Sequence, residues 1–560
     1  MGLGKKVVTF VAAAAILGLF SGCNYIFGED VVGGDDDDVP GPVADGRVLV
    51  DITSDTLLKN TISDPNKADY IIEDYIDVSA KLTIEPGVVI MAKSDRSLTI
   101  TSAGSIVAQG TIQAPIRFIG ESNSAGFWRG IRIESNSTYN ELDSVEISNT
   151  GSSGAGLIIS DGAQAKITNC TFRKNSKFAL DVNGTLGAFA RNRFEDNSGG
   201  DVEVIPNQAG MLDSNSFFGT KVTVTGGSIT RSCTWQNLNV PYSAGYIVAE
   251  EGTFTILPGV RLVFSSDSWF KIEPDAVFVA VGTELQRISF SGANEAMGFW
   301  RGLEVSSGST LNEISFVDIS SAGGANGGAV KLWDNSRLKI TNCRITGNQN
   351  AAIAVNLSAS LPAFSANTLS GNQISMSISA KHIGSLDVLT DYSGNTENDA
   401  VVVNSSDVSG TSNIWKAINV PYIFSSYTNI IGKVTVLPGA KLIFKHDSDI
   451  SVDEDGVLVA VGTPDSIISF VGMRDDDQGT WRGIQINTPS TENELSYCDI
   501  ASGGIGGSGG NINVWDDARV KVTNCTIRQS DGYGIFRRAS ANVTESDNEF
   551  LGCALGQISN

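Results

Sequence analysis

A six-residue motif built around Trp-Arg-Gly occurs three times in the 560-residue chain, and its spacing constrains the fold more than any other feature. The tryptophans of the copies are Trp128, Trp300 and Trp481, so successive copies are 172 and 181 residues apart. A Pro-Gly turn precedes each copy, and a Thr-Asn-Cys sequence follows each at a matching distance. Because several landmarks keep the same spacing, the chain contains three homologous units, which is the signature of a repeat architecture.

A second, shorter period lies within each unit. Short runs in which apolar and polar residues alternate are separated by Gly, Asn, Asp and Ser, which predicts short β-strands. In the first unit such runs end at Ile147, Phe172 and Phe194, and the spacing across the three units is 22–27 residues. This period, with two or three strands per turn, predicts the coil of a parallel β-helix, in which neighbouring coils bury the inward side chains.

The order of motifs along the chain resembles that of right-handed parallel β-helix proteins of the pectin-lyase-like class. The resemblance rests on Leu-Thr-Ile-Glu-Pro-Gly at 82–87, a following strand and Gly-Thr, then Trp-Arg-Gly and Asn-Glu-Leu. More narrowly, the chain is similar to exported β-helix lipoproteins of bacteria. The resemblance implies an all-β, right-handed parallel β-helix of about 20 coils. We expect this solenoid over 47–560, in three units at about 47–235, 236–415 and 416–560.

The first 22 residues have the pattern of a secretory signal. A positively charged start precedes an apolar run over 7–20, which is too short to span a membrane. The Phe-Ser-Gly-Cys sequence that ends at Cys23 resembles the bacterial lipobox, which implies that Cys23 is acylated; an ordinary cleaved signal is the alternative. Segment 23–46 is acidic and predicts a disordered tether. These features predict a lipid-anchored protein of the cell envelope, with the outer membrane as the expected location and surface exposure as one possibility.

The net charge of −23 excludes one class of partner. Nucleic-acid binding is dominated by the neutralisation of phosphates with Lys and Arg, so no nucleic-acid partner is expected. The membrane is expected as a partner only through the N-terminal lipid, because an acidic protein has no basic face for anionic headgroups.

Three equivalent arginines are candidates for a catalytic base, because β-helix lyases use Arg or Lys in that role. A catalytic site is normally single, whereas Arg129, Arg301 and Arg482 repeat with the units, so a structural role is favoured. The two histidines of the chain, His382 and His446, lie in no recognisable motif and are interpreted as surface residues. No catalytic residue is therefore predicted.

Lyases of this class also need a cluster of carboxylates that binds calcium. The equivalent outward residues Glu146, Asp318 and Asp499 are about seven coils apart and cannot meet at one ion. One acidic run interrupts the repeat in the third unit, and a calcium-binding loop or a solvated loop are the two interpretations. This weak calcium candidate consists of Asp475, Asp476 and Asp477. No other cofactor is expected.

Two Trp-Asp pairs are the best binding candidates. Trp333 and Trp515 each follow an inward apolar residue, so strand alternation points them outward. An exposed tryptophan beside a carboxylate suits a sugar, and a tryptophan packed over a turn is the alternative. Because the coil frame repeats, both pairs are expected on one face, about 34 Å apart. The predicted carbohydrate-binding residues are Trp333, Asp334, Trp515 and Asp516.

The cysteines of the repeat are interpreted as buried residues. Cys170, Cys343 and Cys525 follow Thr-Asn and alternate with inward residues, which favours small buried hydrophobes. Cys498 and Cys525 occupy one inward column on successive coils, where a spacing of about 4.8 Å permits a disulfide. Valine takes the place of Cys498 in the other units, so two buried thiols are favoured.

Taken together, these patterns favour a non-catalytic protein that binds or scaffolds polysaccharide at the cell surface, or that serves in adhesion. A polysaccharide lyase or glycosidase of the pectin-lyase-like class is the first alternative, and a purely structural surface rod is the second. A cluster of carboxylates that breaks the threefold repeat on one face would favour the enzyme.

Overall fold

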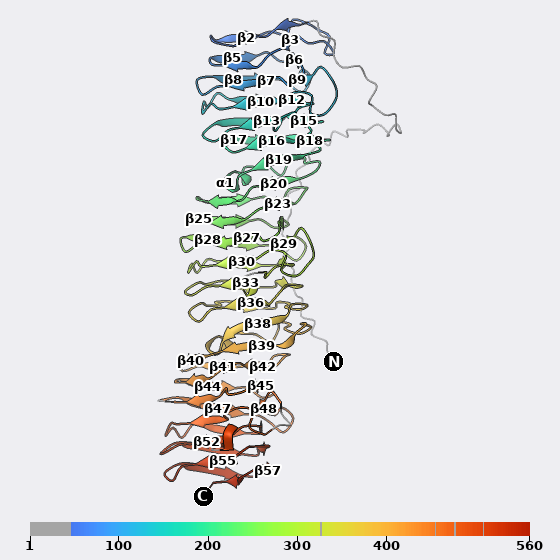
Figure 1. The fold of residues 1–560 in the computed structure, drawn as a ribbon. Coiled ribbons are helices and arrows are strands. Elements are labelled where there is room, and N and C mark those ends of the chain that lie inside the picture. Colours follow the sequence, from blue (N-terminus) through green and yellow to red (C-terminus); the bar gives the residue numbers. More distant parts are fainter. Residues whose placement is uncertain (1–45, 325–326, 454, 475–477, 508, 560) are drawn as a thin grey trace, which may run out of the picture. The chain divides into compact units, whose positions relative to one another are not determined.

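The computed structural model describes residues 46–559 except 325–326, 454, 475–477 and 508. The described chain is a parallel β-solenoid of about 21 turns, from β1 (Arg47–Val48) to β58 (Gly556–Ile558). Figure 1 shows its strands stacked coil upon coil, with neighbouring strands paired in parallel. The predicted all-β solenoid is confirmed. The predictions for the signal peptide, for Cys23 and for the tether up to residue 45 lie outside the described residues, as does the run Asp475–Asp477.

Each coil contributes one strand to each of three faces. In unit one we call β9 (Ile116–Gly120), β10 (Gly130–Ile133) and β11 (Glu141–Asp143) the first, second and third strand of their coil. Each stacks on its equivalent in the next coil, in three separate sheets. The alternation of inward and outward side chains buries residues such as Phe118 and Leu142 completely.

The repeat changes face at each junction between units. The 12-stranded sheet contains β10, a second strand of unit one, and also β29 (Ile288–Gly292), a first strand of unit two. The 14-stranded sheet likewise joins β30 (Gly302–Val305), a second strand of unit two, to β48 (Ile468–Gly472), a first strand of unit three. Each unit is therefore turned by one face about the axis of the coils, relative to the unit before it.

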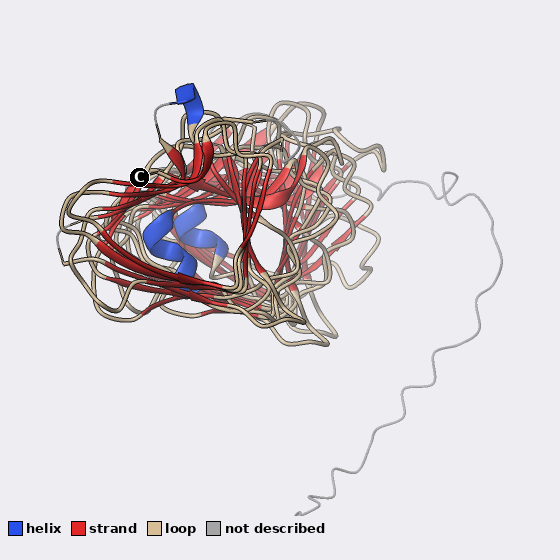
Figure 2. Cartoon of the chain, turned by 90° about the horizontal axis from the view of Figure 1, so that it is seen from below, coloured by secondary structure: helices blue, strands red, loops and turns tan. Residues whose placement is uncertain are grey.

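A short helical turn lies at each junction. The helical turns α1 (Pro206–Ala209) and η2 (Ala380–Ser385) stand where a third strand is expected, and Figure 2 shows helices as a few short turns among the strands. A proline at the start of α1 fits a helix but cannot donate to a strand ladder. The next ladder strand, β20 (Val222–Val224), pairs with the second strand β19 (Gly200–Val204), and the new unit continues from there. None of the described helices is long and apolar enough to cross a membrane.

The second junction helix buries one of the two histidines. His382 lies in η2 with only 5% of its surface exposed, so its interpretation as a surface residue is wrong. Its Nε2 lies 3.2 Å from the carbonyl oxygen of Asn356, and burial lowers its pKa. The physical reason is that η2 interrupts the repeat and packs against neighbouring coils, which no repeat pattern indicates. His446 is exposed, as predicted.

The tryptophan of the Trp-Arg-Gly motif belongs to the core. Trp128, Trp300 and Trp481 have no solvent exposure, and the indole Nε1 of each donates to a backbone carbonyl 2.8 Å away. The acceptor residues are, in the same order, Ser148, Ser320 and Ala501. The three copies therefore fill the same inward position and link successive coils in the same way.

The glycine of the motif is required by a close approach of two coils. Gly130, Gly302 and Gly483 have φ values of +101°, +108° and +86°, which disfavour residues with a side chain. A Cβ on Gly130 would lie 2.2 Å from the carbonyl oxygen of Gly156 in the next coil. The conformation and the close contact together explain why glycine stands at this position in every unit.

Cys498 and Cys525 lie in one inward column on successive coils, as predicted. Asp499 pairs with Thr526 in neighbouring strands, so Cys498 and Cys525, one residue earlier, are in register on successive coils. Both are buried and both are free thiols. The hydrogen bond with Cys525, together with burial, raises the pKa of Cys498.

Candidate functional site

The arginines of the three motifs are held in ion pairs. Arg129 Nε donates to Asp95 at 2.9 Å, and Arg301 and Arg482 make the same bond to equivalent aspartates. Asp95, at φ +60°, occupies a tight turn, and the hydrogen bond from Arg129 lowers its pKa to about 2. The other two aspartates are Asp267 and Asp447. An arginine that ties down a turn in every unit has a structural role, as the repetition predicts.

The equivalent outward acids are also paired. Glu146 bonds to two arginines of its own sheet, and Asp318 and Asp499 bond to one arginine each. In the part of the chain that the structure describes, no three His, Cys, Asp or Glu side chains are arranged to hold a metal ion. The calcium candidate at 475–477 stays a prediction, because those residues are not described.

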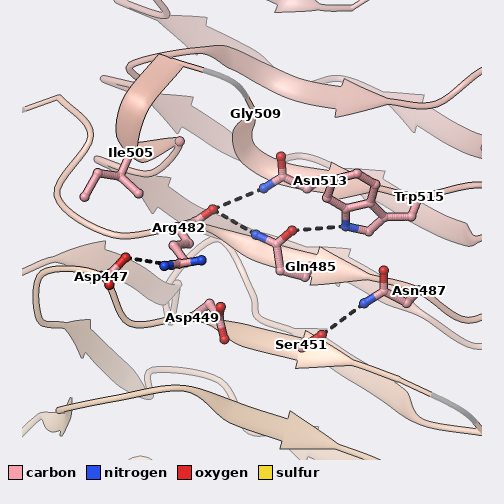
Figure 3. Close-up of a pocket in the computed structure, with 11 residues that line it drawn as sticks. Asp447, Asp449, Ser451, Arg482, Gln485, Asn487, Ile505, Gly509, Asn513 and Trp515 are labelled. Carbon is pink, nitrogen blue, oxygen red and sulfur yellow. Dashed lines mark hydrogen bonds and ion pairs between the residues drawn. The ribbon is translucent and has the colours of Figure 1, made fainter.

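A pocket of about 630 Å³ lies on the outward face of the second strands of unit three. These strands are β46 (Ile450–Val452), β49 (Ile484–Ile486) and β52 (Gly510–Val514). Figure 3 shows how side chains from all three strands and from the loop before β52 surround it. Its lining residues are Asp447, Asp449, Ser451, Arg482, Gln485, Asn487, Gly504, Ile505, Gly509, Asn513 and Trp515.

Trp515 forms one wall of this pocket. Its ring is half-buried, and its Nε1 lies 3.1 Å from the Gln485 side-chain oxygen, which fixes the orientation of the indole. The guanidinium of Arg538, from the next coil, lies 5.1 Å from the ring centroid, within the range of a cation–π contact. Asn513 is almost fully buried and donates to the carbonyl oxygen of Arg482 at 3.2 Å. The wall and floor of the pocket are therefore fixed by hydrogen bonds before any ligand binds.

Asp449 differs from every other carboxylate in the pocket. Asp447 is paired with Arg482, whereas the Asp449 side chain makes no hydrogen bond or ion pair to a described residue. Burial raises the pKa of Asp449 to about 6, although Arg482 acts in the opposite direction. The equivalent residues of units one and two are Ser97 and Trp269, so this carboxylate breaks the repeat. Sequence reasoning missed Asp449, although the break in the repeat was a visible signal.

An exposed tyrosine stands next to Asp449 on the side away from Trp515. Thr428 pairs with Ile450 in the neighbouring strand, so Tyr427 is opposite Asp449. Its side chain is 55% exposed. In unit two the equivalent Tyr246 is covered by Trp269, at a centroid distance of 5.0 Å. Tyr427 and Asp449 thus lie side by side at the start of their strands, and Trp515 lies on the same face past the end of β52.

The second tryptophan candidate is exposed as predicted, but its environment is different. Trp333 is 37% exposed, and its Nε1 lies 3.3 Å from Glu304, the equivalent of Gln485. The ammonium group of Lys331 lies 5.2 Å from the ring centroid. Asp334 accepts a backbone hydrogen bond from Ser358 at 2.9 Å. Asp516 similarly lies near the Ser540 hydroxyl, so both aspartates stabilise turns.

The prediction that both tryptophans lie on one face is wrong. Trp333 follows β33 (Gly328–Leu332), which belongs to the 14-stranded sheet. Trp515 follows β52, which belongs to a different, 7-stranded sheet. The cause is the change of face at the junction between the two units, which a repeat spacing measured along the chain does not reveal. The two sites therefore point in different directions from the axis of the coils.

The comparisons with known proteins concern the fold. Residues 129–256 match the family model described as a right handed beta helix region. This segment extends from the first Trp-Arg-Gly motif across the first junction to β25 (Gly252–Ile256). Comparison with curated proteins gave no match. The continuous parallel stacking from β1 to β58 agrees with this match, and the chain has the fold of a right-handed parallel β-helix.

Proposed function

We propose that this protein binds polysaccharide without cleaving it, and that the pocket of unit three is its principal binding site. The observation that carries the proposal is the pocket itself, in which a half-exposed indole, two side-chain amides and an unpaired carboxylate converge. Ligand sites in proteins are typically concave, with aromatic walls and a few fixed polar groups.

The chemistry of the lining suits a sugar better than an apolar ligand. The flat apolar ring of Trp515 matches the C–H face of a pyranose, and the edges of the ring are then free for hydrogen bonds. Gln485 and Asn487 can donate and accept, and Asp449 accepts from hydroxyl groups. Tyr427 is a second exposed aromatic group on the same face, so more than one sugar residue can be contacted.

Replacing Trp515 with serine is expected to reduce affinity for the polysaccharide by about tenfold or more, since a buried aromatic contact contributes on the order of 1.4 kcal/mol or more. Serine is the matched choice because unit one carries Ser160 at the equivalent position of the same fold. Retardation of the purified protein in native gels that contain a panel of polysaccharides measures the effect.

The control for this experiment is Trp333→Ser, made at the equivalent position of unit two. Because Trp333 lies on another sheet, its loss should leave binding at the unit-three pocket unchanged. Circular dichroism verifies that both variants keep the β-helix. Equal retardation of Trp515→Ser and the unaltered protein contradicts the proposal, and retardation by no polysaccharide leaves the purely structural role as the better explanation.

A lyase or glycosidase is the second candidate, and Asp449 is the observation that favours it. A carboxyl group with a pKa of about 6 is partly protonated near neutral pH and is suited to general acid–base catalysis. The discriminating measurement is the release of unsaturated or reducing sugar ends from a polysaccharide that the protein binds. Product release that disappears in Asp449→Asn supports the enzyme, and binding without any product supports the non-catalytic role.

The proposal also includes attachment to the membrane through lipid on Cys23, as the lipobox-like sequence implies. Cys23→Ser is expected to release the protein from the membrane fraction, because one acylated residue is the only anchor that the sequence predicts. Incorporation of labelled fatty acid into the unaltered protein measures the modification directly. A protein that takes up no label and stays with the soluble fraction is an ordinary secreted protein.

A further inference from the structure

The lining of the unit-three pocket carries one more negative charge than positive charge. Two carboxylates and one guanidinium line it, and Arg482 is committed to Asp447. The remaining charge belongs to Asp449, which is half-buried, directly precedes β46 and stands next to Tyr427, whereas Trp515 follows the far end of β52, two strands further along the sheet. A carboxylate that is withdrawn from water without a partner is costly, so the site is incomplete as it stands.

We propose that this pocket binds a sugar residue that carries an ammonium group, so that the natural class of ligand is an amino-sugar polymer or oligomer. The inference rests on the proposed function, and it specifies the chemistry of the sugar. An ammonium group supplies the missing charge to Asp449, whereas the hydroxyls of a neutral sugar supply only dipoles.

The equivalent positions in the other units explain why the site is specific to unit three. Unit one has Ser97 in the place of Asp449 and Ser160 in the place of Trp515, so it has neither the charge nor the ring. Unit two has Trp269 in the place of Asp449, and Lys271 and Lys331 lie near its tryptophans. Unit two therefore lacks the carboxylate, and among the described residues unit three combines an unpaired carboxylate with a half-exposed indole in the lining of one pocket.

The pH dependence of binding separates a cationic ligand from a neutral one. An ammonium group stabilises the ionised form of Asp449, so affinity should rise as pH increases through about 6 and fall again once the amine of the sugar loses its own proton. A neutral sugar buries the carboxylate further and favours its protonated form, so its affinity should stay level or fall over the same range. The other charged or titratable groups around Asp449 are Asp447, Asp453, Arg482, Arg538, His446 and Tyr427.

The test compares β-1,4-linked glucosamine trimers with the N-acetylated trimers of the same length, in which a neutral acetamide replaces each charged amine. Titration calorimetry with the full-length protein at pH 5, 6 and 7 should give at least tenfold tighter binding of the amine form at pH 7. Asp449→Asn, which keeps the size and shape of the side chain, should abolish this preference. Asp516→Asn removes the same charge one residue from Trp515 but outside the pocket lining, and it should change nothing.

Three results would overturn the inference. Equal affinity of the unaltered protein for the two trimers would overturn the inference. The proposed function would still stand if Trp515→Ser weakens the binding of both trimers. A preference that survives in Asp449→Asn, or that is lost equally in Asp516→Asn, assigns the effect to the overall acidity of the protein. Failure to bind either trimer, together with no retardation by any polysaccharide, removes both the inference and the proposed function.

Discussion

Replacing Trp481 with alanine is expected to lower the free energy of unfolding by about 3–5 kcal/mol, the usual cost of deleting a buried aromatic side chain. The ring has no solvent exposure and stacks on Phe444 at a centroid distance of 4.0 Å. Its loss leaves a cavity between coils and also leaves the carbonyl oxygen of Ala501 without its donor. Denaturation with guanidinium chloride, followed by circular dichroism, measures the effect.

Two further variants divide this effect into its parts. Trp481→Phe keeps an aromatic ring against Phe444 but removes the indole N–H, so its loss should be about 1–3 kcal/mol. Trp515→Ser removes a half-exposed tryptophan from the same unit and should cost far less than Trp481→Ala. A Trp481→Ala protein that unfolds like the unaltered one, yet fails to bind polysaccharide, would show that the motif serves function and not the core.

Replacing Asn348 with serine is expected to cost about 2–4 kcal/mol, because this residue belongs to a buried ladder of asparagines. Asn348 has no solvent exposure, and its side-chain oxygen accepts from the backbone N–H of Ala322 at 2.8 Å. Its amide nitrogen donates to the carbonyl oxygen of Ile319 and to the side-chain oxygen of Asn372 in the next coil. A serine is too short to reach these groups, so buried backbone groups lose their partners.

Unit three supplies the control for this prediction. It carries Ser530 at the position equivalent to Asn348, and there Asn511 from a neighbouring strand bonds to Gly503 and Ile500 instead. Unit two has Ala329 at the position of Asn511. The double variant Asn348→Ser with Ala329→Asn should therefore recover much of the lost stability. If the double variant is no more stable than the single one, the hydrogen bonds of the ladder are not the source of the loss.

Most features of a single coil were predictable from the sequence, because they depend on residues that are close together in the chain. Alternation along a strand placed Trp333 outward, and the 22–27-residue spacing placed Cys498 and Cys525 in one column. The threefold repetition favoured a structural role over a catalytic one for Arg129, Arg301 and Arg482, and each of them forms an ion pair with an aspartate. These inferences hold because each coil repeats the same local geometry.

The pocket of unit three was predicted only in part. Trp515 was identified, but the residues that line the pocket with it, such as Gln485 and Asp449, come from about 30–65 residues earlier in the chain. That Asp449 lacks a partner, and that burial raises its pKa, are consequences of where neighbouring side chains point. Alternation gives the inward or outward side of a strand, and it does not give the neighbours of an outward residue across several coils.

The sequence by itself determined the coil: its length, its strands, its inward residues and its threefold repetition, because local alternation and stacking between neighbours decide these. Only the tertiary structure decided how the units are arranged around the axis. Each unit begins one face further around the axis than the unit before it, which separates Trp333 from Trp515. A spacing along the chain counts residues, whereas the direction of a side chain around the axis depends on how many strand positions lie between the two residues.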